Sequence, residues 1–198
     1  GGALYFWGGN SHLVRNNVFT ADSSHNGAGL YTVNTFTLIE GNRFESNYSW
    51  SHGGGMMANG GTHKILNNLF KNNTALISGG GLRADAGTDT LINNAVIGNI
   101  AGEYGGGMLL YCSYAGVFNN VIAGNASGTS GGMELNTLSA TISNNTLFGN
   151  SADTTILPNY IHAGGLFINY GTNTVNNNIF WGNNINSLTN VPGADYYR

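Results

Sequence analysis

Hydrophobic residues occur along this chain in short runs that return at one fixed spacing. The first apolar residue after each glycine-rich stretch is separated from the next by 26, 26, 26, 26, 25 and 33 residues. These residues are Leu4, Leu30, Met56, Leu82, Met108, Met133 and Leu166. An asparagine later in each repeat keeps nearly the same period, at Asn17, Asn42, Asn68, Asn94, Asn120, Asn145 and Asn178. Two independent landmarks with one period indicate a solenoid in which each repeat forms one coil.

Each repeat predicts three short strands around a shared interior. Alternation in the first strand places Leu4 and Phe6 inside and Tyr5 and Trp7 outside. A second inward column, three residues before the later asparagine, comprises Val14, Ile39, Ile65, Leu91, Val117, Ile142 and Val175. A third column, two residues after it, comprises Phe19, Phe44, Phe70, Val96, Ile122, Leu147 and Phe180. The pattern therefore predicts an all-β parallel solenoid of about seven coils, each of about 26 residues.

Polar and flexible residues recur at the expected corners. One column comprises Asp22, Asn47, Asn73, Asn99, Asn125, Asn150 and Asn183. In stacked coils each asparagine amide can donate to the next and can also bond the bending backbone, so we expect a structural asparagine ladder. The glycines before each first strand fit tight corners that need positive φ. Helical repeats are disfavoured because the apolar runs are short and rich in Gly, Asn and Thr.

The repeat predicts one β-helix domain over residues 1–198. Its coils are expected to begin near residues 1, 27, 53, 79, 105, 131 and 163. The longer spacing before the last coil predicts an insertion loop over residues 151–162, and residues 184–198 form a tail outside the pattern. Because the chain begins inside a repeat, we expect it to be a segment of a longer or processed protein.

Composition disfavours several classes of partner. Charged residues make up 8% of the chain and the net charge is -3, which provides no basic surface for nucleic acid. The apolar runs are far shorter than the ~20 residues that span a bilayer, so no membrane span is expected. Cys112 is the single cysteine, which excludes an internal disulfide, and we interpret it as a small structural residue near a strand end.

The histidines do not predict a metal site. His12 and His63 share a register two coils apart, and His52 and His162 share one three to four coils apart. These separations are too large for a shared metal without other ligands, so all four are expected to be solvated turn residues. No metal and no other cofactor is expected.

Two short motifs carry a resemblance to a known family. The first is Gly1-Gly2-Ala3-Leu4, and the second, Phe-x-x-Asn, occurs at residues 44–47, 70–73 and 180–183. Together they resemble the repeat of polymorphic outer-membrane proteins, which are surface adhesins of the autotransporter type, and more widely the right-handed parallel β-helix proteins. The resemblance implies a right-handed single-stranded parallel β-helix with an extracellular or cell-surface location. It says little about activity, because this scaffold serves adhesins, polysaccharide lyases, hydrolases and viral tailspikes.

Enzymes that share this scaffold commonly use the outward face of the first strand, which offers few charged groups here. Arg83 and Asp85 lie together in the fourth coil, and Glu134 lies about two coils further on. At ~4.8 Å per coil the two carboxylates are roughly 10 Å apart, at the limit for a glycosidase pair. A polysaccharide lyase or glycoside hydrolase that uses Arg83, Asp85 and Glu134 is therefore the alternative function.

Aromatic residues are more prominent than charged ones on the same face. The outward set suited to stacking on sugars, or to packing against another protein, comprises Tyr5, Trp7, Tyr31, Tyr111 and Phe167. Simple stabilisation of the strands by stacked side chains explains them equally well. The leading hypothesis is a non-catalytic extracellular or cell-surface rod, adhesin-like or structural. It would bind carbohydrate or a surface protein, pack against flanking coils of a longer chain, or assemble end to end into filaments.

Overall fold

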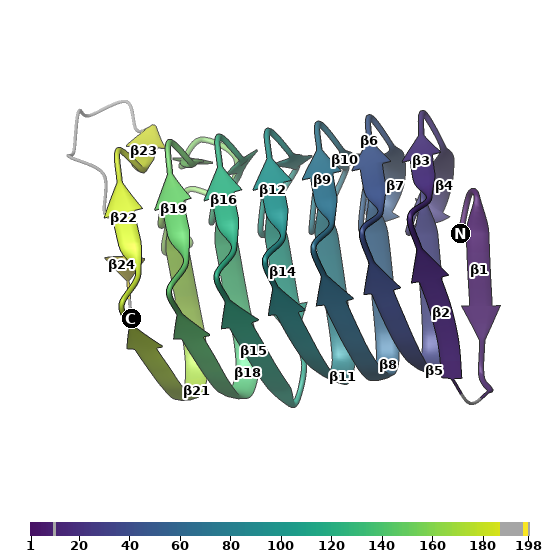
Figure 1. Ribbon diagram of the computed structural model, residues 1–198. Coiled ribbons are helices and arrows are strands. Elements are labelled where there is room, and N and C mark those ends of the chain that lie inside the picture. Colours follow the sequence, from purple (N-terminus) through teal and green to yellow (C-terminus); the bar gives the residue numbers. More distant parts are fainter. Residues whose placement is uncertain (10, 187–195, 198) are drawn as a thin grey trace.

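The computed structural model describes residues 1–9, 11–186 and 196–197. Figure 1 shows coils stacked side by side along one axis, with the two chain ends at opposite ends of the stack. The described residues form strands and turns without a helix. Strands of neighbouring coils pair in parallel in all three sheets. The predicted all-β parallel solenoid is confirmed.

Three sheets run along the solenoid axis. The first contains β1 (Leu4–Trp7), β2 (Ser11–Arg15), β5 (Leu30–Glu40), β8 (Met56–Leu66), β11 (Leu82–Ile92), β14 (Met108–Tyr111), β15 (Tyr114–Phe118), β18 (Met133–Ser143), β21 (Leu166–Asn176) and β24 (Tyr196–Tyr197). The second contains β3 (Val18–Thr20), β6 (Arg43–Glu45), β9 (Leu69–Lys71), β12 (Ala95–Ile97), β16 (Val121–Ala123), β19 (Thr146–Phe148) and β22 (Ile179–Trp181). The third contains β4 (Ser23–Asn26), β7 (Tyr48–His52), β10 (Thr74–Ala75), β13 (Ile100–Ala101), β17 (Ala126–Ser127), β20 (Ser151–Asp153) and β23 (Asn184–Asn186).

The strands differ from the expected three per coil in two ways. In most coils the first two expected strands are the halves of one bent 11-residue strand, such as β8. The bend falls where Gly60 and Gly61 have φ of 68° and 90°. A Cβ on Gly61 would lie 2.1 Å from the Thr35 carbonyl oxygen, so only glycine allows this approach of adjacent coils. The short strands of the third sheet were not predicted, because they contain too few residues to show alternation.

The three predicted apolar columns form the core. Phe44 and Phe70 of the third column are fully buried, with ring centroids 4.8 Å apart and planes 3° apart. Complete burial of such a side chain contributes roughly 1.5–3 kcal/mol. At the ends of the stack Leu4, Phe6, Val175 and Phe180 are only partly buried, because each has a neighbouring coil on one side. The core is therefore a continuous rod of like side chains.

Two asparagine ladders fix the corners. In the predicted ladder, Asn73 donates from Nδ2 to Asn99 Oδ1 over 3.0 Å and to the Phe44 carbonyl oxygen over 2.9 Å. A second ladder, not predicted as such, runs through the other asparagine column, where Asn68 donates to Asn94 Oδ1 over 3.1 Å. These amides satisfy buried backbone groups that the turns leave without a strand partner.

A polar pair lies within the core. His63 Nδ1 is 2.7 Å from Asp89 Oδ1, and neither side chain is exposed. His63 Nε2 is 3.0 Å from the Thr32 hydroxyl. The expectation that His63 is a solvated turn residue was wrong, because its position follows the bend and points inward, where Thr37 and Asp89 occupy the same register. Cys112 is buried, as its structural interpretation requires.

The insertion leaves the solenoid later than expected. Residues 151–153 form β20 and pair with β17 and β23, so the segment that protrudes comprises residues 154–162. His162 Nδ1 lies 2.7 Å from the Gly128 carbonyl oxygen and ties the end of the segment to the preceding coil. In the expected tail, residues 184–186 form β23 and residues 196–197 pair with β21, while residues 187–195 and 198 lie outside the described residues.

Candidate functional site

A cleft of about 620 Å³ lies on the outward face of the first sheet, across the coils of β11, β14, β18 and β21. The protruding segment borders it. Its lining comprises His52, Ile77, Arg83, Tyr104, Leu109, Tyr111, Thr129, Glu134, Asn136, Asn159, Tyr160, Ile161, Phe167 and Asn169. Alternation along parallel strands turns every second residue toward this face, and the register brings Arg83, Leu109 and Glu134 side by side.

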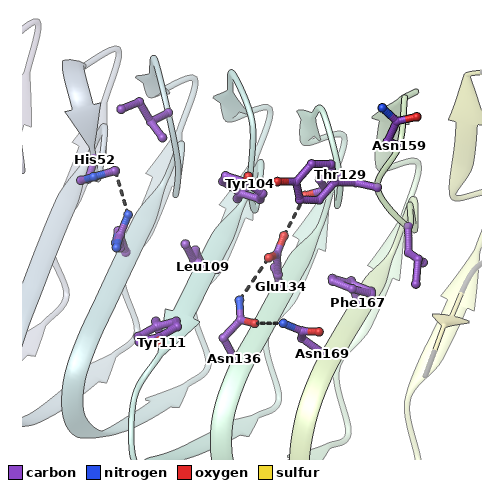
Figure 2. A pocket seen from close by; sticks show the side chains of 14 residues that line it. His52, Tyr104, Leu109, Tyr111, Thr129, Glu134, Asn136, Asn159, Phe167 and Asn169 are labelled. Atoms are coloured by element: carbon purple, nitrogen blue, oxygen red, sulfur yellow. Dashed lines mark hydrogen bonds between the residues drawn. The ribbon is translucent and has the colours of Figure 1, made fainter. Parts of the chain in front are cut away.

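Glu134 occupies the centre of the cleft and is 4% exposed. Figure 2 shows its carboxylate between Leu109 and Phe167, with hydrogen bonds to Thr129 and Asn136. Oε2 accepts the hydroxyls of Thr129 over 2.8 Å and of Ser130 over 3.0 Å, and Oε1 accepts Nδ2 of Asn136 over 3.1 Å. Burial raises the pKa of Glu134 despite these donors and the nearby Arg83.

The polar side chains at the floor of the cleft continue from Glu134 through Asn136 into the last coil. Its Oδ1 accepts Nδ2 of Asn169 over 2.8 Å, a bond that Figure 2 also shows. The Tyr170 hydroxyl donates to the Asn136 carbonyl oxygen over 3.1 Å. Desolvation, together with a hydrogen bond to Tyr111, raises the pKa of Tyr170. Two coils are thus held in register by polar side chains that face outward.

Arg83 lies at the other end of the cleft and is already engaged. Its Nε is 2.9 Å from both carboxylate oxygens of Asp85. Its Nη1 donates to the Ser78 hydroxyl over 2.7 Å and to His52 Nδ1 over 2.8 Å. Burial, then the charge of Arg83 and that of His25, lower the pKa of His52 to about 4, so its imidazole is neutral at pH 7.

Aromatic side chains form the walls. Tyr104 and Tyr160 meet edge to face, with ring centroids 6.1 Å apart and planes at 66°. Burial, the hydrogen bond with Tyr160 and the negative charges of Glu103 and Glu134 raise the pKa of Tyr104 to about 12. Tyr160 belongs to the protruding segment, so the insertion contributes a wall of the cleft rather than a separate structure.

The structure brings together four of the eight residues selected from the sequence. Arg83, Glu134, Tyr111 and Phe167 line the cleft. Asp85 lies beside it, paired with Arg83. The remaining three, Tyr5, Trp7 and Tyr31, belong to β1 and β5 near the N-terminal end and do not line the cleft.

Several lining residues were missed. His52, Tyr104 and Thr129 come from the corners that precede the glycines, and Asn159, Tyr160 and Ile161 come from the insertion. The insertion was recognised from the irregular spacing of the last coil, but the period of the repeat does not encode the path of an extra segment. The corner residues do not follow the alternation of the strands, so the pattern that identifies outward strand residues does not identify them.

The described residues contain no group of three or more His, Cys, Asp or Glu side chains that could hold a metal ion. No helix long and apolar enough to cross a membrane occurs among them.

Comparisons with known proteins agree with the observed architecture. Neither the curated proteins nor the solved structures contain a match to this chain. The model of a protein family described as the right handed beta helix region matches residues 1–147, which is more than half of the 198 residues. The parallel solenoid, its stacked columns and this match together show that the chain belongs to the right-handed β-helix family.

Proposed function

We propose that this protein is an extracellular or cell-surface, non-catalytic β-helix of the adhesin type that binds carbohydrate in the cleft. The observation that carries the proposal is the juxtaposition of aromatic walls with a floor of amide and carboxylate groups on rigid strands. A sugar ring packs its C–H faces on aromatic rings and bonds its hydroxyls to fixed polar groups.

The size and position of the cleft support a ligand of several sugar units. Its volume of about 620 Å³ falls within the range of about 300–1,000 Å³ that is typical of ligand sites. The lining extends from Arg83 in β11 to Phe167 in β21, a span of three coil steps. At ~4.8 Å per step this corresponds to roughly 14 Å along the axis, enough for a short oligosaccharide.

The charged groups favour binding over catalysis. Among the described residues that line the cleft, Glu134 is the one carboxylate. Both carboxylate oxygens of Asp85, which lies beside the cleft, accept from Arg83 Nε. A glycosidase needs two carboxyl groups that act on the same bond. Because Asp85 is ion-paired with Arg83, it does not supply the second carboxyl group.

Binding is tested with a glycan array, followed by calorimetry on the hits. Phe167→Ala and Tyr111→Ala each remove an aromatic wall and are expected to weaken binding at least tenfold. Tyr5→Ala is the matched control, because Tyr5 is half exposed on the same sheet and lies outside the cleft. The proposal fails if no glycan binds, or if the cleft variants bind as tightly as the Tyr5 variant.

A second candidate function, cleavage of a polysaccharide, is favoured by one observation. The raised pKa of Glu134 is a property of catalytic acids. Incubation of the protein with polysaccharides and assay for new reducing ends or unsaturated products tests this candidate. Turnover that is abolished by Arg83→Gln with Asp85→Asn, and separately by Glu134→Gln, would identify an enzyme. Glycan binding without turnover supports the binding function.

A further inference from the structure

The carboxylate of Glu134 forms no ion pair with the described residues, although the charge of Arg83 acts on it from a distance. Its three hydrogen-bond donors, Thr129, Ser130 and Asn136, are all neutral. Each carboxylate oxygen can accept about two hydrogen bonds, so Oε1, with its single bond from Asn136, keeps a position for a further donor. A carboxylate that is 4% exposed gains more from a cation than one in water does, because solvent screens the attraction less.

The cations near Glu134 do not fill this role. Arg83 is the basic side chain of the lining that carries a charge at pH 7, and Asp85 holds it in an ion pair with a shortest distance of 2.9 Å. His52 also lines the cleft, but its imidazole is neutral beside Arg83. When Glu134 is ionised, it is the carboxylate of the lining that no ion pair neutralises, and a bound cation would favour that ionised form.

The surroundings of Glu134 favour a positive group. Figure 2 shows Leu109 and Phe167 on either side of its carboxylate, with Tyr104 close by on the wall. Aromatic faces attract cations through the negative charge on their π surfaces, and an acid within an aromatic enclosure is a known way to recognise an ammonium group. Glu103 adds a second negative charge near Tyr104. The carboxylates of Glu134 and Glu103 therefore both act on the same aromatic side chain, Tyr104.

We infer that the cleft selects a saccharide with a free amino group, whose ammonium binds between Glu134, Tyr104 and Phe167. This inference rests on the proposed carbohydrate binding and specifies its ligand class as amino sugars that are not acetylated. Acidic saccharides are disfavoured by Glu134, and neutral ones lose the charge interaction while keeping their contacts with the aromatic walls.

Calorimetry on three tetrasaccharides of equal length tests the inference. The probes are a glucosamine tetramer, its fully N-acetylated counterpart and a uronic-acid tetramer, each measured at about pH 6, where a primary amine is protonated. We expect the glucosamine tetramer to bind at least tenfold more tightly than the acetylated one, and the uronic-acid tetramer to bind more weakly than either. In Glu134→Gln the preference for the free amine should disappear, so the affinities of the glucosamine tetramer and of the acetylated tetramer should become about equal.

Measurable binding of the acetylated tetramer by Glu134→Gln, at whatever affinity, shows that the cleft of the variant is intact. Tyr104→Leu, compared with Tyr104→Phe, tests the aromatic contribution, since only the former loses the ring face. Equal affinity of the unsubstituted protein for the two glucosamine-based tetramers, or a preference for the uronic acid, would overturn the inference and leave carbohydrate binding in place. Absence of binding to these probes and to every glycan of the array would overturn both.

Discussion

Asn136 donates its side-chain amide to Glu134 over 3.1 Å, two residues along the same strand and on the same outward face of β18. The bond stabilises the ionised form of a carboxylate whose burial favours the neutral form. The cleft therefore contains an acid whose charge depends on its immediate neighbours.

Removal of this donor should make Glu134 harder to ionise. In Asn136→Ala one hydrogen bond to the charged form is lost, so the pKa of Glu134 should rise further above its usual range. Carboxyl chemical shifts followed by NMR during a pH titration measure this directly. Asn169→Ala is the matched control, because Asn169 contacts Asn136 and not Glu134. An unchanged pKa in Asn136→Ala would contradict the role of this bond.

Glu134 should also make stability depend on pH in a defined direction. Its folded-state pKa is raised above the ordinary value of 4.5, so the folded protein binds the proton more tightly than the unfolded chain does. The contribution of Glu134 is then most favourable below pH 4.5 and is lost as pH rises through the folded-state pKa. Denaturant unfolding measures the free energy of unfolding of Glu134→Gln and of the unsubstituted protein at pH 4 and pH 7. The difference between the two should shift in favour of Glu134→Gln at pH 7. An equal difference at both pH values would contradict the shift.

His52 should act in the opposite direction across an adjacent pH range. Its pKa falls from 6.5 to about 4 on folding, so the unfolded chain binds more protons between these values. Its contribution to stability is complete above pH 6.5 and is lost as pH falls toward 4. When the pH is lowered from 7 to 4.5, the melting temperature should fall less in His52→Gln than in the unsubstituted protein. His12→Gln serves as a control from another coil, since His12 lies outside the cleft.

Substitution of an asparagine inside a ladder should cost much more stability than substitution of one at the end of a ladder. Asn73 is fully buried, accepts hydrogen bonds from the backbone and side chain of Asn47, and donates to Phe44 and Asn99. Asn73→Ala leaves several buried groups unsatisfied and should cost about 3 kcal/mol or more of unfolding free energy. Asn17→Ala, at the exposed end of the other ladder, should cost less than about 1 kcal/mol. Urea unfolding measures both, and similar losses would argue against the ladder as a major stabilising feature.

Disruption of the buried His63–Asp89 pair should cost more stability than disruption of an exposed ion pair. His63→Ala removes the partner of a fully buried carboxylate and should cost about 3–5 kcal/mol. Glu40→Ala breaks the exposed pair with Arg15 and should cost less than about 1 kcal/mol. Asp89 Oδ2 is buried without a hydrogen-bond partner in the described structure, so joint replacement of His63 and Asp89 by apolar residues should restore much of the loss. Failure of the double variant to recover stability would show that the pair is needed for packing.

Alternation along the first strand was sufficient to predict part of the candidate site. Arg83, Glu134, Tyr111 and Phe167 were selected because they point outward, and the cleft contains all four. Tyr5 and Trp7 follow the same rule but lie in β1, at the opposite end of the stack from the insertion. A periodic sequence treats all coils alike, so it cannot show which part of an outward face becomes concave.

The repeat pattern of the chain is sufficient to predict the solenoid. Its period, its three apolar columns and its asparagine columns define which residues stack, because parallel coils place like residues one above another. The position of the cleft, in contrast, depends on tertiary packing. The cleft exists because the segment 154–162 returns beside the outward face of four coils, and Tyr160 reaches Tyr104 there. Tertiary packing also pairs His63 with Asp89, since a bend in the strand turns both inward. These contacts depend on the path of irregular backbone, which hydrophobic periodicity does not encode.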